Sequence, residues 1–180
     1  TPAFWMLTIA NLSSSISTTT LALHLVPKLT DMGMSLSNSG LIVLISTAVA
    51  LPSQFIASYM GDRFPKTQVI FVLLLLQAGS IFIIAIAHDT YMAMVFAVMY
   101  GVGFGGRIPL LTAIRGEYFG RKAFATIMGL SQLPNNLGMI VAPLFAGYMF
   151  DATGTYFVPF TIFATLNLSG AFLVLFVRRP

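Results

Sequence analysis

Residues 67–87 read TQVIFVLLLLQAGSIFIIAIA, a run that contains no charged side chain and is rich in Leu, Ile and Phe. The hydrocarbon core of a bilayer is about 30 Å thick, and a helix needs roughly 20 apolar residues to cross it. Five more stretches of similar character occur along the chain. The six predicted membrane-spanning helices are residues 3–26, 38–57, 67–87, 91–113, 123–149 and 156–177. The sequence therefore predicts an all-α membrane protein with six transmembrane helices.

The charged residues between these stretches are distributed unevenly. The basic residues of alternate links and of the chain end are Arg63, Lys66, Arg115, Arg121, Lys122, Arg178 and Arg179. The opposite links carry Asp31, Asp89 and Asp151, and Lys28 is their one basic residue. Because cytoplasmic links are enriched in Lys and Arg, the basic side is predicted to be cytoplasmic. An even number of crossings then places both termini in the cytoplasm.

The composition agrees with a membrane protein and argues against other classes of function. Charged residues make up 8% of the chain, against about 25% in soluble domains, and hydrophobic residues make up 57%. The net charge of +4 does not indicate nucleic-acid binding, because the basic residues flank the predicted spans. The chain has no Cys, and its two His residues, His24 and His88, are far apart. Neither a metal site nor a cofactor is therefore expected.

The whole chain, residues 1–180, is expected to form one six-helix bundle without a soluble domain. The chain begins with Thr1, and its first apolar stretch lacks the basic leader and small-residue cleavage site of a secretion signal. That stretch is therefore interpreted as a membrane span, and the chain as a segment of a longer protein.

The link between the second and third predicted helices contains a motif. Residues 58–66 read SYMGDRFPK, in which Gly61 precedes the pair Asp62 and Arg63. This segment resembles the signature of the major facilitator superfamily, with Ser58 and Pro65 in place of its two glycines. The match points to a family of membrane transporters.

Other regions extend this resemblance over essentially the whole chain. Residues 129–147 contain the spaced glycines and the Ala-Pro pair of the penultimate helix of such transporters, and residues 150–156 (FDATGTY) resemble their last outer loop. Residues 3–5 (AFW) and the segment 24–33 resemble the start of the second half in the monocarboxylate and oxalate-formate branch. The six helices would then correspond to helices seven to twelve of twelve.

The resemblance implies one half of a secondary transporter in the plasma or inner membrane, surrounded by the lipid bilayer. Such transporters bind a small-molecule substrate near the bilayer midplane, between two six-helix bundles. The partner would be the missing N-terminal half, and the substrate would move by alternating access. A membrane assembly subunit or an inactive truncated transporter fits the same helices. Substrate identity, coupling ion and oligomeric state are left open by the sequence.

Polar residues within the spans predict where a substrate cavity lies, because unpaired polar groups in hydrocarbon cost free energy. One stripe near the middle of the first helix consists of Asn11, Ser14, Ser15 and Thr18. Their spacing of three and four residues places them on one face, so Asn11, Ser14 and Thr18 are predicted to contact substrate. The alternative is that the hydroxyls bond to carbonyls of their own helix.

The fifth predicted helix carries amide side chains at its centre. Gln132, Asn135 and Asn136 share a face beside Pro134, which removes one backbone donor from the helix. These amides are predicted to contact substrate, as is Gln54 of the second helix. The alternative is that they bond neighbouring helices, at roughly 1 kcal/mol for each bond.

Arg107 is the strongest single candidate for substrate binding. It lies inside the fourth predicted helix, where exposure to lipid would cost at least about 2.5 kcal/mol. Phe96, Tyr100 and Gly103 lie on its face of the helix, so Tyr100 is predicted to line the same site. A planar guanidinium binds a carboxylate or phosphate through two parallel hydrogen bonds, which favours an organic anion as substrate. The alternative is that Arg107 extends toward cytoplasmic water or pairs structurally with a carbonyl at a helix end.

The position of this cation differs from the pattern that the resemblance implies. In the oxalate-formate branch, cationic residues on the counterparts of the second and fifth helices neutralise the substrate. This chain has Gln54 and the amides at those places, and its cation lies on the fourth helix. The difference argues against a dicarboxylate substrate.

A group of charged residues is expected at the cytoplasmic ends of the second to fourth helices. Its members are Asp62, Arg63, Arg115 and Glu117. The resemblance implies that such a cluster of ion pairs stabilises the outward-open state and loosens when the two halves move. The alternative is ordinary solvated charge, worth about 0 to 1 kcal/mol for each pair.

The remaining motifs favour packing over chemistry. Residues 101–106 (GVGFGG) satisfy a dinucleotide-binding pattern, but no strand precedes them, so close helix packing through Gly101 and Gly105 is expected instead. Gly138 and Ala142 form a second pair of small residues. The chain contains neither a Gly-x-Ser-x-Gly element nor a His-Glu-x-x-His run, and it is therefore not expected to be an enzyme.

Two further expectations concern single helices. His24 lies near the outer end of the first helix, where a residue that titrates near neutral pH is a candidate for proton coupling. The third and sixth helices carry few polar residues, among them Gln77 and Asn167. These two helices are expected to lie outside the cavity, against lipid.

Overall fold

The computed structural model describes residues 1–178, except for the side chains of residues 121–123. Its helices are α1 (Pro2–Asp31), α2 (Leu36–Arg63), α3 (Lys66–Ile86), α4 (Thr90–Thr153) and α5 (Phe157–Leu175). Within α4, Gly120 has the non-helical angles φ 72° and ψ 169°, so two helices meet there. We call them the first half of α4 (Thr90–Gly120) and the second half (residues 121–153). The described chain thus forms six helical segments, as the sequence predicts.

The helix ends follow from local sequence. The side chain of Ser35 accepts a hydrogen bond from the Asn38 N–H at 3.2 Å, and that of Asp89 accepts one from the Met92 N–H at 2.7 Å. These caps satisfy backbone donors that would otherwise lack partners. α2 ends at Phe64, which is extended because a residue before proline avoids the helical conformation.

The sequence predicts a non-helical link at residues 114–122, and this prediction is wrong for all of the segment up to Gly120. Helical conformation continues through Arg115 and Glu117 as far as Gly120, where φ is positive. Arg and Glu are good helix formers, so their charge did not end the helix. Glycine adopts positive φ without a steric penalty, and the reversal of direction occurs at that residue. The first half of α4 is consequently longer than the predicted span of 91–113.

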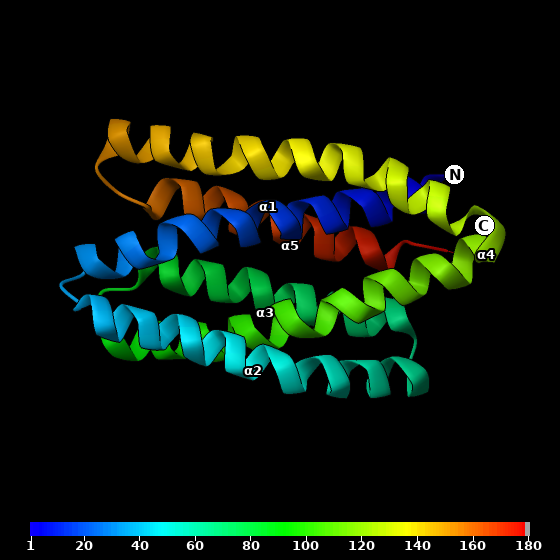
Figure 1. Ribbon diagram of the computed structural model, residues 1–180, viewed down its shortest axis with the longest axis horizontal. Coiled ribbons are helices and arrows are strands. Elements are labelled where there is room, and N and C mark those ends of the chain that lie inside the picture. The colour runs from blue at the N-terminus through cyan, green and yellow to red at the C-terminus, as the bar shows by residue number, and fades with distance from the viewer. Residues whose placement is uncertain (179–180) are drawn as a thin grey trace.

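The helices run along the long axis of the molecule, and both chain ends lie at the same end of the bundle (Figure 1). The α2–α3 link and the bend at Gly120 lie at that end as well, and the other three links lie at the opposite end. This arrangement agrees with an even number of crossings. The cytoplasmic location of the shared end stays a prediction.

Among the described residues, four helices are long and apolar enough to cross a membrane: Leu36–Arg63, Lys66–Ile86, Thr90–Gly120 and Phe157–Leu175. They coincide with the second, third, fourth and sixth predicted spans. α1 and the second half of α4 are the helices that carry the predicted polar stripes.

Glycines bring the first half of α4 close to its neighbours. A Cβ atom at Gly101 would lie 2.5 Å from the carbonyl oxygen of Ser46 in α2, and one at Gly105 would collide with the backbone of Ala50. The predicted packing role of Gly101 and Gly105 is confirmed. Gly138 plays the same part in the second half of α4, because a Cβ there would lie 2.6 Å from Leu12 of α1.

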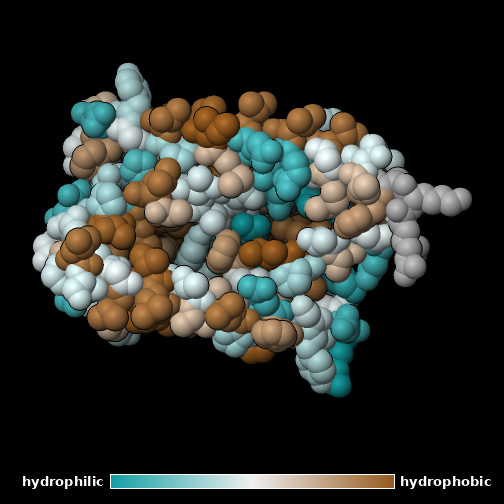
Figure 2. Space-filling view, in the orientation of Figure 1, coloured by the Kyte–Doolittle hydropathy of each residue, from teal (hydrophilic) through white to brown (hydrophobic). Residues whose placement is uncertain are grey.

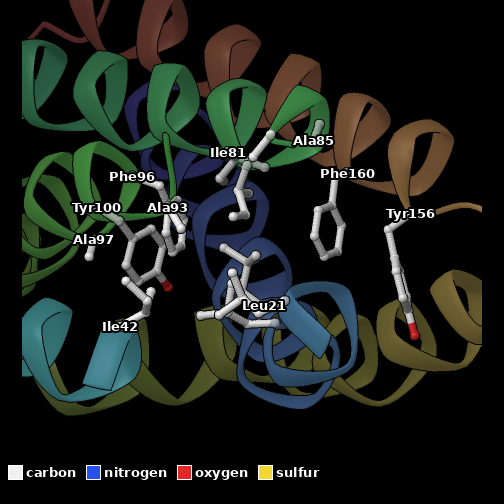
Figure 3. Close-up of a cluster of buried hydrophobic side chains, with 14 of the residues drawn as sticks. Leu21, Ile42, Ile81, Ala85, Ala93, Phe96, Ala97, Tyr100, Tyr156 and Phe160 are labelled. Atoms are coloured by element: carbon white, nitrogen blue, oxygen red, sulfur yellow. The ribbon is translucent and has the colours of Figure 1, made fainter. Parts of the chain in front are cut away.

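All five elements contribute to a hydrophobic cluster at the end of the bundle that lies opposite the chain termini. Its members include Leu21 of α1, Ile42 of α2, Ile81 of α3, Phe96 of α4 and Phe160 of α5 (Figure 3). Burial of a large apolar side chain stabilises a water-exposed fold by about 1.5–3 kcal/mol, but in lipid the gain comes mainly from close packing. The cluster holds the helices together at this end and leaves the middle of one face free for polar residues.

Candidate functional site

A cavity of about 440 Å³ lies between α1 and the two halves of α4. Its larger polar lining residues are Asn11, Thr18, Arg107, Arg115, Gln132, Asn135 and Asn136. Phe104, Leu111 and Met139 contribute apolar surface. Figure 2 shows hydrophilic residues gathered in a hollow in the middle of this face, among hydrophobic residues. The described lining contains no residue of α3 or α5, as expected for helices outside the cavity.

Arg107 lies near the middle of the first half of α4, because that helix continues to Gly120. The residue is 5% exposed. Its Nη2 donates a hydrogen bond to the Thr18 hydroxyl at 3.4 Å, and its guanidinium carbon lies 5.6 Å from the ring centroid of Phe104. The Nε atom has no hydrogen-bond partner among the described residues. A buried guanidinium therefore lines the cavity with donors to spare.

No carboxylate compensates this charge within the described part of the chain. The salt bridges found there join Lys66 with Glu117 and His88 with Asp89, and neither involves Arg107. A buried charge without a partner is costly, because burial removes the water that would solvate it. The charge of Arg107 is therefore not neutralised by the described part of the bundle.

Thr18 connects Arg107 to a buried polar group. The Gln77 side-chain nitrogen donates to the Thr18 hydroxyl at 3.2 Å, and the Ser14 hydroxyl donates to the Gln77 side-chain oxygen. Ser14 is fully buried and faces α3, so it does not line the cavity. Gln77 was not among the predicted site residues, because it lies in the most apolar stretch of the chain and on a helix that was expected to lie outside the cavity.

The amides of the second half of α4 face α1. Asn11 donates to the side-chain oxygen of Asn135 at 3.2 Å, and Asn135 donates to the sulfur of Met139 at 3.4 Å. Gln132 and Asn136 are exposed in the cavity. Asn135 thus joins two helices, whereas Gln132 and Asn136 present their amide groups to the cavity.

The structure brings six of the nine predicted substrate-contacting residues to the cavity and leaves three outside it. Those at the cavity are Asn11, Thr18, Arg107, Gln132, Asn135 and Asn136. Those outside are Ser14, Tyr100 and Gln54. Tyr100 is buried between Phe96 and Phe104, with ring centroids 5.2 and 5.6 Å away, and Gln54 is half-buried on α2. Contact with a substrate stays a prediction for all nine.

Arg115 is misplaced in the predicted cluster of ion pairs. It is 3% exposed and lines the cavity, where it donates to the carbonyl oxygen of Leu7 at 3.4 Å and approaches the sulfur of Met128 at 3.9 Å. The cause is the longer helix, which carries Arg115 into the bundle instead of a link. The cavity therefore has a second buried guanidinium.

The other members of the predicted cluster lie beside the α2–α3 link. Glu117 forms a salt bridge with Lys66, with 2.7 Å between Nζ and Oε1, and Asp62 lines the same polar recess. The guanidinium of Arg63 lies over the ring of Tyr59, 4.5 Å from its centroid. The side chains of Arg121 and Lys122 lie outside the described residues. A role of this group in conformational change stays a prediction.

His24 lies away from the cavity and joins three helices. Its Nε2 is 3.0 Å from the carbonyl oxygen of Pro143 in the second half of α4, and its Nδ1 is 3.4 Å from the Tyr156 hydroxyl. A carbonyl accepts only, so Nε2 carries a proton and donates to Pro143. These contacts describe a structural link, and proton coupling by His24 stays a prediction.

Comparisons with known proteins show to which family the chain is similar. Residues 4–180 match the family model of the Major Facilitator Superfamily. Monocarboxylate transporter 13 of Rattus norvegicus is 23% identical over 82% of this chain and 35% of that protein. The bacillibactin exporter of Bacillus subtilis (strain 168) is 30% identical over 76% of this chain and 36% of that protein. The chain thus spans about a third of the length of these relatives.

A solved structure shows the same fold. The peptide transporter POT in complex with sulfate superposes with a TM-score of 0.83 at 18% identity, over 96% of this chain and 37% of that chain. The predicted resemblance to the superfamily and its monocarboxylate branch is confirmed, and the relatives are membrane transporters of small molecules. This is a multi-pass membrane protein, and it belongs to the Major Facilitator Superfamily.

Proposed function

We propose that this six-helix bundle is one half of a secondary transporter that moves a small organic anion by alternating access. The observation that carries the proposal is the buried guanidinium of Arg107, which lines a cavity and has no carboxylate partner in the described chain. In this proposal, transport requires this bundle together with a second six-helix bundle. The anion supplies the negative charge that Arg107 lacks within the described chain.

The energetics of burial support an anionic substrate. The Thr18 hydroxyl and the Phe104 ring contact the guanidinium, but neither neutralises it. Leaving a buried charge uncompensated typically costs 3–5 kcal/mol, so a ligand that supplies the counter-charge recovers part of that cost. A carboxylate also matches the planar donor geometry of arginine. Arg107 is therefore the proposed anchor for the acidic group.

Beyond the guanidinium groups of Arg107 and Arg115, the cavity lining supports a ligand body of mixed polarity. Gln132 and Asn136 offer donors and acceptors without charge, and Phe104, Leu111 and Met139 offer apolar contact. A volume of about 440 Å³ lies within the range of small-molecule sites. The site suits a small molecule with an acidic group and a compact body of mixed polarity.

The second bundle is proposed from apolar surfaces that this bundle leaves exposed. Leu44, Leu51 and Phe55 of α2 and Leu137 and Val141 of α4 are exposed. Large exposed apolar patches mark contacts with lipid or with another protein surface. We place the missing N-terminal half over the cavity, where it closes the site and moves against this bundle to expose substrate to each side in turn.

Uptake by the paired bundles tests the proposal. Proteoliposomes that contain both bundles should accumulate radiolabelled small monocarboxylates and discriminate against the neutral amide analogues. Arg107→Ala should abolish this uptake, and Arg107→Lys should retain it with a weaker affinity, because lysine keeps the charge without the bidentate geometry.

A matched control removes a cation elsewhere. Lys28 lies near the end of α1 and donates to the carbonyl oxygen of Ala87, outside the cavity. Lys28→Ala should leave uptake within about twofold of the wild type, because removal of a surface charge has little effect on a buried site. Unchanged uptake by Arg107→Ala would reject the anion site. Absence of any uptake by the wild-type pair would favour an assembly subunit.

A further inference from the structure

We propose that Gln77, a residue of α3 outside the cavity, positions the Arg107 guanidinium for anion binding by way of the Thr18 hydroxyl. The inference rests on the proposed function, because it concerns the same guanidinium. It assigns a role in the site to a helix that does not line it.

The Thr18 hydroxyl uses all of its hydrogen-bonding capacity. It donates to the backbone carbonyl oxygen of Ser14 at 2.9 Å and accepts from Gln77 Nε2 at 3.2 Å and from Arg107 Nη2 at 3.4 Å. A hydroxyl has one donor and two acceptor sites, so every site is occupied. The three bonds together fix the orientation of the Thr18 hydroxyl. Because Arg107 donates to this hydroxyl, the position of its guanidinium depends on that orientation.

The direction of the Gln77 amide follows from the same bonds. Because the Thr18 proton is directed to the Ser14 carbonyl, the Gln77 group facing Thr18 must be the donating nitrogen. The amide oxygen then accepts from the Ser14 hydroxyl. Gln77 is fully buried, and both ends of its amide are held by α1. The side chain thus acts as a fixed strut between α3 and α1.

A close contact between helices brings Gln77 to this place. A Cβ atom at Gly103 would lie 2.6 Å from the carbonyl oxygen of Leu73 and 2.7 Å from the backbone nitrogen of Gln77. Gly103 lies one turn before Arg107 in the first half of α4. The missing side chain lets α3 pack directly behind the turn that carries Arg107. The strut and the guanidinium are therefore parts of one packed unit.

The strut leaves the rest of the guanidinium free for a ligand. One Nη nitrogen is bonded to Thr18, whereas Nε has no partner among the described residues. A long arginine side chain otherwise loses rotamer entropy when it binds an anion. Fixing one nitrogen in advance reduces that loss, so removal of the strut should weaken anion affinity more than the rate of transport.

The first test compares two buried amides in the paired bundles. Gln77→Met removes the strut but keeps its length. Asn167→Leu removes an amide in α5 that is also fully buried but has no hydrogen-bond partner among the described residues. We expect Gln77→Met to raise the KM for a monocarboxylate about five- to tenfold, the effect of one lost hydrogen bond, with the maximal rate within about twofold. Asn167→Leu should change neither value.

The second test does not depend on transport. Gln77→Glu places a carboxylate next to Thr18, which in turn contacts the buried Arg107 guanidinium. The apparent melting temperature in detergent should fall less in the Arg107 background than in the Arg107→Met background, because the new charge is compensated only in the first. In the paired bundles, Gln77→Glu should lower uptake at least tenfold, since its carboxylate competes with the substrate anion.

The outcomes separate this role from the proposed function. Equal shifts of melting temperature in the two backgrounds, or an equal rise of KM in Gln77→Met and Asn167→Leu, would overturn the role of Gln77 alone. Uptake that survives Arg107→Ala would overturn the proposed function, and the positioning role with it.

Discussion

The cavity around Arg107 and the recess beside the α2–α3 link both contain charged residues, but they differ in whether those charges are paired and exposed to solvent. In the recess, Lys66 and Glu117 form an ion pair 2.7 Å long, and the Glu117 side chain is 54% exposed. In the cavity, Arg107 is 5% exposed and its one hydrogen-bond partner is the neutral Thr18 hydroxyl. One region neutralises its charge near solvent, and the other buries a charge that the described bundle does not neutralise.

This contrast shows which charges carry information about function. An exposed ion pair contributes about 0–1 kcal/mol and is easily replaced. A buried guanidinium without a carboxylate is costly for the bundle alone, and the proposed function assigns its counter-charge to the substrate. The charge-rich motif at residues 58–66 resembles the family signature, whereas the buried Arg107 is the residue on which the proposed site depends.

Reversing the buried charge is expected to have the largest effect. Arg107→Glu should lower monocarboxylate uptake at least a hundredfold, because like charges placed together in a desolvated site repel by several kcal/mol. Lys28→Glu makes the same change of charge outside the cavity and should alter uptake less than twofold. Initial uptake rates of the paired bundles measure both. Similar losses in the two variants would mean that total charge, and not the cavity, controls uptake.

Overpacking the contact between α2 and the first half of α4 is expected to have the next largest effect. Gly105→Val adds a side chain that collides with the backbone of Ala50, so the free energy of unfolding should fall by about 3 kcal/mol. Gly129→Ala is the matched control, because nothing lies within 4 Å of a Cβ at that position. Denaturation in mixed micelles measures the difference. An unchanged free energy of unfolding in Gly105→Val would show that the close approach of α4 to α2 does not require a glycine at this position.

Much of the fold and part of the site could be predicted from the sequence. The six spans follow from the lengths of the apolar stretches, because the bilayer imposes a minimum length on a helix. The faces of Asn11, Thr18 and Asn135 follow from helical spacing, and Arg107 follows from the cost of a charge within a span. These arguments use one helix at a time.

The remainder depends on how helices contact each other. Arg115 was assigned to a link, because charged residues between apolar stretches resemble a loop, whereas the helix continues to Gly120 and buries it. Gln54 shares a helix with exposed residues, and the rotation of α2 places it outside the cavity. Gln77 reaches the site because Gly103 lets two backbones approach. Periodicity within one helix contains no information about its neighbour.

A smaller effect is expected where two helices meet through neutral groups at the cavity. Asn11→Ala and Asn135→Ala each remove the 3.2 Å bond between α1 and the second half of α4. A double-mutant cycle should give a coupling of about 1 kcal/mol, the usual value for a polar bond between membrane helices. Unfolding free energies of the wild type, both single variants and the double variant provide it. A coupling near zero would leave substrate contact as the main role of these amides.

The smallest effect is expected at the exposed ion pair. Glu117→Gln removes the carboxylate that contacts Lys66, and the free energy of unfolding should change by less than about 1 kcal/mol. The change should shrink further as salt is raised from 0.01 to 0.15 M in the assay, because screening shortens the reach of exposed charges to about 8 Å. Lys66→Gln should give the same result, and the two variants combined should add nothing. If Glu117→Gln instead alters uptake while leaving stability unchanged, the pair acts on the equilibrium between conformations, since only a differential contribution to two states can change transport without changing folding.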